Sequence, residues 1–594
     1  MIVKMDKITL IVSAKDRDAA LENLRDLGIL HVQELPQTTS DSTTALETEI
    51  ARLDEATQII STLDKNAGSP ADSPENIVQN VLSARREITR LESRLQELTS
   101  QFQWYEEWGH ISKSSLETLE KSGVYVRFYI APKDALANLP TDKNIQIARQ
   151  NKQIAHLALF AESADERLDL PEVFLPETDV DSLEKQLRET KTAIAEEQKT
   201  LESYAGATEK LADFRQTLAR RLEFETVKSS LANADSVAYL QGFCPVSETG
   251  NLQKAAENAG WAYLVEQPDA LDDVPTLIRI PKWLRIINPV FEFMGTIPGY
   301  REFDVSFWFL LFFSLFFAML IGDAGYGIIF LICTFFIRRK MPDAPKEPFV
   351  LMVVLSTATV VWGAITGTWF GYEAFAKLPV LSSLIVQQLN SYVAENQTFI
   401  MYLSFVIGVV HLTIAHLTVA LSRLNSPQAI AQLGWIGVLW ALFFLAGNLV
   451  LGNPLPDFML MLLTSGALLV LLFSNFQKNI FKGMLQTLTS LPLDMISAFS
   501  DVVSYIRLFA VGLATVIVAQ SFNEMAIAIG AGTIVGGILA ALVLFAGHAL
   551  NIILALMAVV VHGIRLNMLE FSGHLGMQWS GKAYRPFGES QKEQ

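Results

Sequence analysis

The second half of the chain is a succession of apolar segments, each about as long as a helix that crosses a membrane. Such a helix needs ~20 consecutive, mostly apolar residues to traverse the hydrocarbon core of a bilayer. About eight segments meet this condition: 305–321, 322–338, 349–371, 398–423, 429–451, 457–475, 493–526 and 534–570. The sequence therefore predicts an α-helical membrane domain over 301–594, with about eight transmembrane helices and a short tail. The first two segments are separated only by a glycine-rich turn, which predicts a tight hairpin.

The basic residues between these segments predict the orientation of the membrane domain. Loops on the cytoplasmic side carry an excess of Lys and Arg. With the N-terminus inside, the outer loops hold one basic residue, Lys377, and the inner loops and tail hold nine. The nine are Arg338, Arg339, Lys340, Lys346, Arg423, Lys478, Lys482, Lys582 and Arg585. We therefore expect a multi-pass protein of the cell membrane with both termini in the cytoplasm.

The last two apolar segments, 493–526 and 534–570, are too long for a simple crossing. At 1.5 Å per residue they make helices of ~50–55 Å, against ~30 Å of hydrocarbon. We expect these two helices to tilt, to bend or to extend beyond the bilayer.

Each of these long segments contains an arginine, Arg507 in the first and Arg565 in the second. A guanidinium stays charged at any accessible pH, and burying it at membrane depth costs at least ~2.5–3.5 kcal/mol. Both residues are therefore expected to face protein or water and to be functional. In two upright antiparallel helices, however, Arg565 would lie ~18 Å deeper than Arg507. Both can serve one site only if the helices are tilted and staggered.

Further polar residues follow the helical repeat of the same two segments. Asp494, Ser497, Asp501 and Ser504 lie at steps of 3, 4 and 3 before Arg507, which places them on one helix face. The second segment carries His548, Asn551 and His562 in a similar rhythm, and Glu524 lies near the outer end of the first. The residues suggest two half-paths for an ion on either side of Arg507.

Other interpretations of these polar residues remain open. Small and hydroxyl residues mediate helix packing in membranes, and Asp501 can simply lie near the inner interface. His411 and His416 are five residues apart, so they do not share a helix face and are interpreted as core histidines. No segment has an obvious carboxylate at mid-depth that could carry the ion. We therefore expect the carrier on another subunit.

The first half of the chain has a different composition and predicts a cytoplasmic domain over 1–300. The 594-residue chain has a net charge of −16, and residues from 301 onward hold 14 acidic and 14 basic residues, so the excess lies before them. An acidic domain disfavours nucleic acid and anionic lipid as partners. The N-terminus has no signal-peptide pattern. The two cysteines, far apart in sequence, allow no disulfide framework and no cysteine metal site.

Two kinds of pattern divide this cytoplasmic half. Strand–helix–strand patterns recur at its two ends, and two charged, heptad-like helical stretches enclose a third α/β segment. We predict α/β lobes joined by an antiparallel coiled-coil hairpin; the persistent apolar spacing disfavours solvated helices in a disordered linker. The ranges are a proximal lobe from 1–40 and 235–280, a hairpin from 75–118 and 180–233, a distal lobe at 120–178 and a loop at 61–74.

Motifs for catalysis or cofactors are scarce. The stretch 576–583 resembles a Walker A loop, but it lacks the Ser or Thr that binds Mg²⁺ and has no preceding strand. No HExxH, GxSxG or Cys/His metal pattern occurs. We expect no cofactor, no metal and no catalytic residue in this chain.

Taken together, several motifs identify a family that the whole chain resembles. They are PGYREFD at 298–304, GDAGYG at 322–327, DVVSYIRL at 501–508, HGIRL at 562–566 and GKAYRPF at 581–587. The chain is similar to the membrane subunit of V-type and A-type rotary ATPases, called subunit I in prokaryotes and subunit a in eukaryotes. The resemblance implies a stator subunit that binds no nucleotide and forms two ion half-channels against a rotating ring of proteolipid subunits.

The resemblance also implies roles for single residues. Arg507 and Arg565 would face the ring, Asp494 matches an acidic position of the cytoplasmic half-channel in prokaryotic relatives, and His562 matches a family histidine. Eukaryotic relatives have a histidine at the place of Thr515 and an acidic residue at the place of Ala555. The outer half-channel is therefore expected to be lined differently here, by Glu524, His548 and Asn551.

The partners that the resemblance implies are the proteolipid ring, peripheral-stalk subunits at the N-terminal lobes, a central-stalk or rotor-cap subunit and the lipid bilayer. ATP hydrolysis or synthesis would be coupled to H⁺ or Na⁺ flow, and the sequence decides neither the direction nor the ion. A stand-alone secondary transporter with a coiled-coil regulatory domain is the alternative; it predicts inverted repeats and broken helices. A structural membrane tether would leave Arg507 unexplained.

Overall fold

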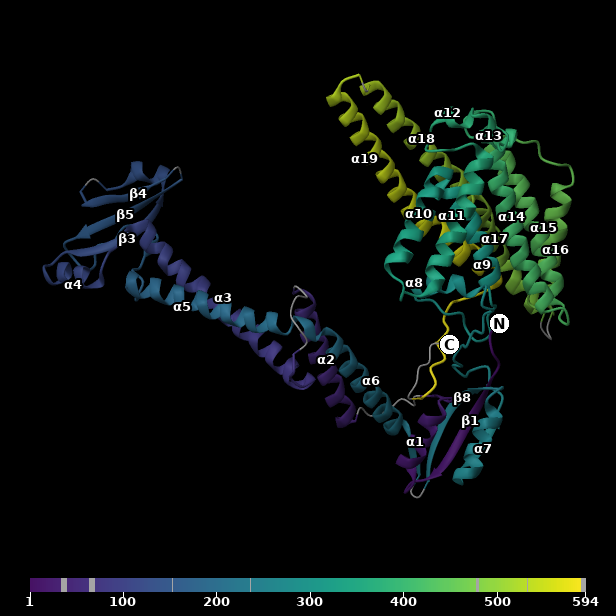
Figure 1. Cartoon of the computed structure of the whole chain (residues 1–594), viewed down its shortest axis with the longest axis horizontal. Coiled ribbons are helices and arrows are strands. Elements are labelled where there is room, and N and C mark those ends of the chain that lie inside the picture. Colours follow the sequence, from purple (N-terminus) through teal and green to yellow (C-terminus); the bar gives the residue numbers. More distant parts are fainter. Residues whose placement is uncertain are drawn as a thin grey trace. The chain divides into compact units, whose positions relative to one another are not determined.

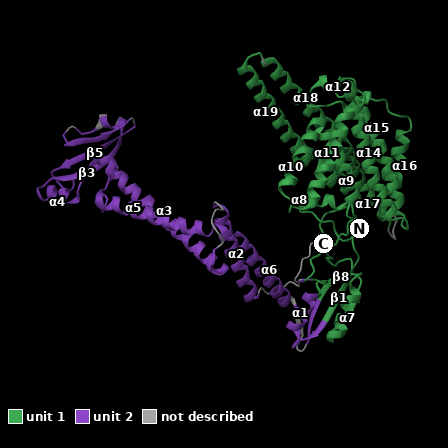
Figure 2. Ribbon diagram, in the orientation of Figure 1, with its two compact units in different colours: residues 1–10, 27–32, 241–587 green, residues 11–26, 33–240, 588–594 purple. Residues whose placement is uncertain are grey.

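A computed structural model describes residues 1–33, 40–63, 70–140, 142–151, 153–234, 237–476, 480–530 and 532–588. The chain divides into two compact units (Figure 2), one from residues 1–10, 27–32 and 241–587 and the other from 11–26, 33–240 and 588–594. The middle of the predicted loop at 61–74 and the predicted inner-loop residue Lys478 lie outside the described residues.

Strands from both ends of the first 300 residues form one five-stranded sheet. It contains β1 (Met5–Ser13), β2 (His31–Val32), β7 (Ala232–Ala234), β8 (Val237–Pro245) and β9 (Ala262–Glu266), in the order β2-β8-β1-β9 with β7 paired to β8. Ile8, Leu10 and Val12 alternate with more exposed residues and are buried, which is the period of a strand with one covered face. The helices of the two strand–helix–strand patterns are α1 (Arg17–Leu27) and α7 (Thr249–Ala259).

Four long helices make up most of the second unit: α2 (Asp41–Ser61), α3 (Pro74–Trp108), α5 (Val180–Ser203) and α6 (Thr208–Ser230). In Figure 1, α3 lies beside α5 and α2 beside α6. Their buried residues include Leu53, Ile77, Leu211 and Leu218, so the heptad-like spacing does bury an apolar face. Helix α2 had no counterpart among the predicted elements. The predicted stretch 180–233 is divided by a short 3₁₀ turn (Ala205–Ala207).

The predicted helix at 75–118 is also shorter than expected, because α3 ends at Gly109 with a φ of 86°. A separate helix, α4 (Lys113–Lys121), leads into a four-stranded sheet. Its strands are β3 (Tyr125–Pro132), β4 (Ile145–Gln150), β5 (Ile154–Ala161) and β6 (Glu172–Val173), in the order β4-β5-β3-β6. Trp104 and Trp108 of α3 pack against Phe128 of β3 and fix the end of the hairpin to this sheet.

Among the described residues, the apolar half of the chain consists mainly of ten α-helices of seven or more residues. They are α8 (Asn288–Met294), α9 (Ser306–Ile321), α10 (Ala324–Lys340), α11 (Lys346–Thr366), α14 (Asn396–Ser422), α15 (Gln428–Leu451), α16 (Met459–Phe473), α17 (Ile480–Ser504), α18 (Ile506–Ile529) and α19 (Ile534–Ala558). Phe309, Phe316, Phe405 and Tyr505 are fully buried and belong to one core that joins these helices.

Within the described residues, five helices are long and apolar enough to cross a membrane. A sixth span results if α9 and α10 count as one; their axes differ by 118° at a two-residue break. That break is the glycine-rich turn that predicted a hairpin, and each of the two helices is shorter than a full span. Helix α16 is apolar but has only 15 residues. The protein is therefore a helical membrane protein, and the number of eight spans stays a prediction.

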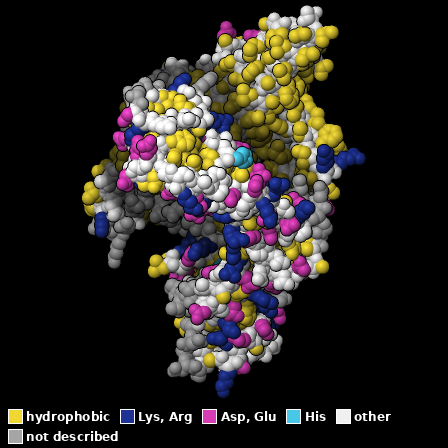
Figure 3. All heavy atoms as spheres, turned by 90° about the vertical axis from the view of Figure 1, so that its left-hand side faces the viewer, with side chains coloured by type: hydrophobic (Ala, Val, Ile, Leu, Met, Phe, Trp, Pro, Cys, Tyr) yellow, Lys and Arg dark blue, Asp and Glu magenta, His cyan; other side chains and the backbone are white. Residues whose placement is uncertain are grey.

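The last two helical segments are even longer than predicted. Helices α17 and α18 form one apolar stretch of 49 residues, Phe481–Ile529, and α19 continues through two π-helical segments to Leu575, 42 residues in all. Figure 1 shows α18 and α19 side by side. Many outward-facing residues of α18 and α19 are large and apolar, and Figure 3 shows a hydrophobic face of the molecule.

The C-terminal tail returns to the first sheet. The hydroxyl of Tyr584 donates a hydrogen bond to the carbonyl oxygen of Ile29 at 2.6 Å, and the backbone N–H of Phe587 donates to that of Leu30 at 2.8 Å. The stretch that resembles a Walker A loop forms bridges in this tail, with Ser580 paired to Ile297 and Ala583 paired to Thr276. Its backbone is thus part of the connection between the helices and the sheet.

Candidate functional site

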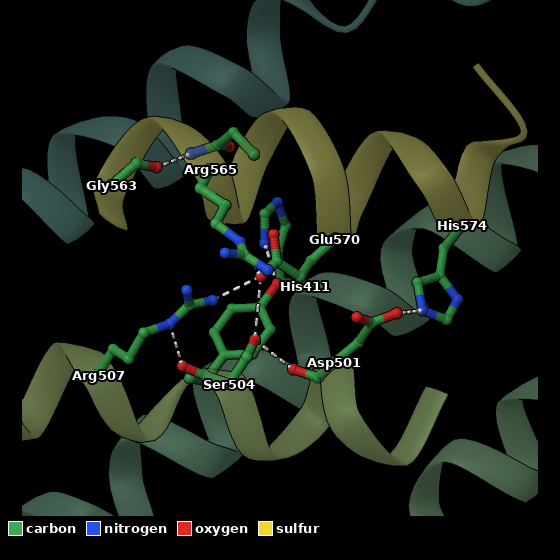
Figure 4. A network of polar contacts seen from close by, with 10 residues as sticks. His411, Asp501, Ser504, Arg507, Gly563, Arg565, Glu570 and His574 are labelled. Carbon is green, nitrogen blue, oxygen red and sulfur yellow. Dashed lines mark hydrogen bonds and ion pairs between the residues drawn. The ribbon is translucent and has the colours of Figure 1, made fainter. Parts of the chain in front are cut away.

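A buried carboxylate, Glu570, lies between the two arginines (Figure 4). Its Oε1 accepts a hydrogen bond from Arg507 Nη2 at 2.5 Å and lies 3.5 Å from Arg565 Nε. The hydroxyl of Ser504 donates to the same oxygen at 3.3 Å. The Glu570 side chain is 3% exposed, against 22% for Arg507 and 55% for Arg565. Sequence reasoning did not single out Glu570, and the expectation that the ion carrier lies on another subunit stays a prediction.

The local backbone explains how both arginines reach one carboxylate. The long helix before Arg507 is interrupted at Tyr505, and Arg565 lies between two π-helical segments, Val559–Gly563 and Leu566–Phe571. Because neither helix is a straight rod at this point, the ~18 Å separation expected for upright helices does not apply. Single-turn π segments inside α-helices occur frequently at functional sites.

A chain of hydrogen-bonded side chains lies next to this centre. Asp501 Oδ2 is 3.2 Å from Nε2 of His574, whose Nδ1 is 2.9 Å from Nε2 of His416. The Nδ1 of His416 is 2.6 Å from Oε1 of Gln432 on α15. His411 lies apart from this chain: it is fully buried, stacks on Phe571 and is 2.9 Å from the Tyr505 hydroxyl. His411 is thus a core histidine, as predicted.

An open pocket of about 520 Å³ connects the two groups of residues. Its lining includes Asp494, Ser497 and Asp501 from α17, and Arg565, Glu570 and His574 from the end of the last long helix. The structure therefore brings together three of the predicted polar residues of α17 with Arg565. Ser504 and Arg507 join them through Glu570.

The remaining predicted residues fall into a second cluster and two isolated positions. His548 Nδ1 is 2.7 Å from the hydroxyl of Tyr326, to which Asn551 Nδ2 also donates at 3.0 Å. Glu524 is exposed, and none of the described hydrogen bonds of this cluster reaches it. His562 is half-buried, and its buried Nδ1 has no hydrogen-bond partner among the described residues.

Sequence reasoning missed Tyr326 and Asp323, although both lie in the GDAGYG motif. Asp323 is 2% exposed and caps α10. Its Oδ1 accepts from the backbone N–H groups of Gly325 and Phe370, and its Oδ2 from that of Gly371, at 2.8–2.9 Å. The carboxylate thus holds the broken helix pair against the loop after α11. An aspartate directly before a helix start was the available signal.

No protein-family model matches this chain. A relative from Borreliella burgdorferi, V-type ATP synthase subunit I, is 32% identical over 621 aligned residues that cover 100% of both chains. The chain belongs to the V-type ATP synthase subunit I family. The subunit I 1 of Treponema pallidum is 29% identical over 99% of this chain and 100% of that one. A crystal structure of the cytoplasmic N-terminal domain of a subunit I covers 44% of this chain at 15% identity, with a TM-score of 0.24.

As a subunit I, the chain is a membrane subunit of a rotary ATPase, and its strongest chemical feature is electrostatic. Two guanidinium groups share one buried carboxylate, so the centre carries a net positive charge. A fixed, partly exposed positive charge attracts a second carboxylate and favours its ionised form. Both arginines lie within the two longest apolar helical stretches of the described residues, Phe481–Ile529 and Ile534–Leu575.

Proposed function

We propose that this chain is the stator subunit that forms two ion half-channels against a rotating proteolipid ring and thereby couples H⁺ or Na⁺ translocation to ATP hydrolysis or synthesis. The observation that carries the proposal is the Arg507–Glu570–Arg565 centre, in which two cations share one buried acid. Family membership supports the rotary context.

An exposed stripe on the last long helix supports a ring surface at this centre. Ile553, Met557, Val561 and Leu569 are each more than half exposed. Arg565 occupies the place between Val561 and Leu569 at the same four-residue step, and its side chain is 55% exposed. A single cation within an otherwise apolar, uncovered stripe fits a partner that is apolar except for one carboxylate per subunit.

The proposed mechanism follows from the charges. A positive charge within ~4–6 Å lowers the pKa of a carboxylate by ~1–3 units. A ring carboxylate that arrives loaded with its ion beside Arg507 therefore releases the ion into one half-channel. Glu570 competes with the ring carboxylate for the same guanidinium, so it limits how tightly Arg507 holds the ring. After release, the ring carboxylate moves on and reloads from the other half-channel.

We assign the two half-channels to the two polar clusters. The pocket lined by Asp494, Asp501 and Glu570 is the cytoplasmic half-channel, in keeping with the positive-inside orientation. The cluster of His548 and Asn551 on Tyr326 lines the outer path, with His562 and Glu524 along the same two helices. Arg507 lies between them and blocks direct flow of ions.

The soluble part has a mechanical role in this proposal. The two α/β sheets and the helical hairpin over 1–300 lie in the cytoplasm and bind peripheral-stalk subunits, which hold the chain still against the torque of the rotor. The membrane part, over 301–594 and with eight spans, lies in the cell membrane, with the central-stalk or rotor-cap subunit as a neighbour. The chain itself binds no nucleotide.

Substitution of Arg507 by alanine tests the proposal. We expect Arg507→Ala to assemble into the complete complex but to abolish ATP-driven ion pumping into membrane vesicles. Arg339→Ala is the matched control, because Arg339 is exposed at the end of α10. Normal pumping by the Arg507 variant would contradict the proposal. Purification in detergent without a proteolipid ring and ATP-hydrolysing subunits would favour a stand-alone transporter.

A further inference from the structure

Four hydrogen-bonded side chains, Gln432, His416, His574 and Asp501, come from four helices and line the pocket. Their contacts run from α15 through α14 and α20 (Ser572–Leu575) to α17, at 2.6, 2.9 and 3.2 Å. Gln432 is partly exposed, His416 is 5% exposed, and the side chains of His574 and Asp501 are 11% and 29% exposed. All four residues line the pocket, so both ends of this chain of contacts reach its water.

With the amide oxygen of Gln432 facing His416, the hydrogen-bond partners determine which nitrogen atoms carry protons. The Oε1 of Gln432 accepts only, so Nδ1 of His416 carries a proton. In a neutral imidazole the other nitrogen accepts, so Nε2 of His416 accepts from Nδ1–H of His574. The remaining nitrogen of His574 faces a carboxylate, which is also an acceptor. The contact is satisfied when His574 is an imidazolium or when Asp501 is protonated.

A second complete arrangement exists with one proton fewer. If the amide of Gln432 turns over, its N–H donates to Nδ1 of His416, Nε2–H of His416 donates to Nδ1 of His574, and Nε2–H of His574 donates to ionised Asp501. Every contact is satisfied again with both imidazoles neutral. The same residues can therefore hold or release one proton without losing a hydrogen bond.

We propose that His416, His574 and Asp501 form a proton store that exchanges with the Arg507–Glu570 centre through the pocket. The inference rests on the proposed function and specifies H⁺ as the ion that uses this half-channel. On loading, the Gln432 amide turns over and Nδ1 of His416 takes a proton from pocket water, while the Nε2 proton of His416 moves to Nδ1 of His574 and makes it an imidazolium beside ionised Asp501. On unloading, the Nδ1 proton of His574 returns to Nε2 of His416, Nδ1 of His416 releases its proton to water, and the Gln432 amide turns back.

Charged groups from three of the helix segments around the pocket face this store. The pocket-lining residues of α15, Gln432 and Trp435, carry no charge. The charged and titratable groups of the lining are His416 and Arg423 of α14, Asp494 and Asp501 of α17, and Arg565, Glu570 and His574 of the last long helix. Histidine suits the role because it changes charge between pH 5 and 8.

The test uses the complete complex in proteoliposomes with its cytoplasmic face outward. The rate of ATP-driven acidification of the lumen, per assembled complex, is measured at external pH 6 to 8 for the wild type, His574→Gln and His416→Gln. Without the store, proton supply depends on the bulk proton concentration, which falls 100-fold from pH 6 to pH 8, so we expect the ratio of variant to wild-type pumping to fall by up to about 100-fold over this range. His110→Gln, an exposed histidine in the second unit, is the control.

Chemical rescue separates proton storage from a merely structural role. The pocket is open, so added imidazole can enter the space left in His574→Ala, and we expect it to restore pumping at pH 8. Unchanged pH profiles in both glutamine variants, or no rescue by imidazole, would overturn the proton store. Pumping of Na⁺ without H⁺ by the wild-type complex would overturn it as well. Failure of the proposed function itself would instead appear as normal pumping by Arg507→Ala.

Discussion

Substitution of Glu570 by glutamine is the most direct test of the charge balance at the centre. The change removes one negative charge and keeps the size of the side chain. Glu570 is almost fully desolvated, and its Oε1 is 2.5 Å from Arg507 Nη2. The variant leaves two guanidinium groups without their shared acid. We therefore expect Arg507 to pair more tightly with the ring carboxylate and to release it more slowly.

The magnitude follows from the burial of the three groups. Removing one partner of a buried ion pair costs ~3–5 kcal/mol. Arg507 and Arg565 are 22% and 55% exposed and regain part of their hydration, so we take ~2–3 kcal/mol as the net change. If this energy goes into holding the ring carboxylate, rotation slows by about 30- to 150-fold.

The assay measures ATP hydrolysis and ion pumping together in vesicles that contain the assembled complex. We expect both rates to fall by the same factor, because a trapped ring stops hydrolysis as well. Glu570→Asp keeps the charge and should retain most activity, and Glu524→Gln changes an exposed acid and should have little effect. Rapid hydrolysis without pumping, or wild-type rates for both, would refute the competition between Glu570 and the ring.

Two further predictions concern pKa shifts outside the membrane helices. The hydrogen bond of Lys7 with Asp272 at 2.8 Å lowers the pKa of Asp272 and raises that of Lys7. The pair should therefore stabilise the first sheet by up to ~1 kcal/mol between about pH 4 and 10. This contribution is lost as pH falls through the lowered pKa of Asp272. We expect a smaller protection of the β1 amides from hydrogen exchange below pH 4 than above it in the wild type, and no such pH-dependent change in Asp272→Asn. Burial raises the pKa of the Cys244 thiol to about 12, whereas Cys333 is exposed. A membrane-permeant maleimide at pH 7 should label Cys333 alone, and equal labelling of Cys244 in the folded protein would contradict its burial.

Local patterns in the sequence were sufficient to predict most of the helices and strands and to identify the family. Apolar length identified the membrane helices, and alternation identified strands such as β1. The energetic cost of a buried guanidinium singled out Arg507 and Arg565. The heptad spacing predicted the helical hairpin, although α2 was missed and the break near Ala205 was not expected. These properties depend on neighbours within a few turns, so one sequence is enough to find them.

Tertiary structure alone decided which of these residues meet. Glu570 follows Arg507 by 63 residues and reaches it because the helices are broken at Tyr505 and distorted to π-helix around Arg565. His416 and His574 are 158 residues apart and touch through the packing of α14 against α20. A periodic pattern identifies the face on which a side chain lies. It does not determine the depth, bend or stagger at which two faces meet, and the charges of this centre balance only through those contacts.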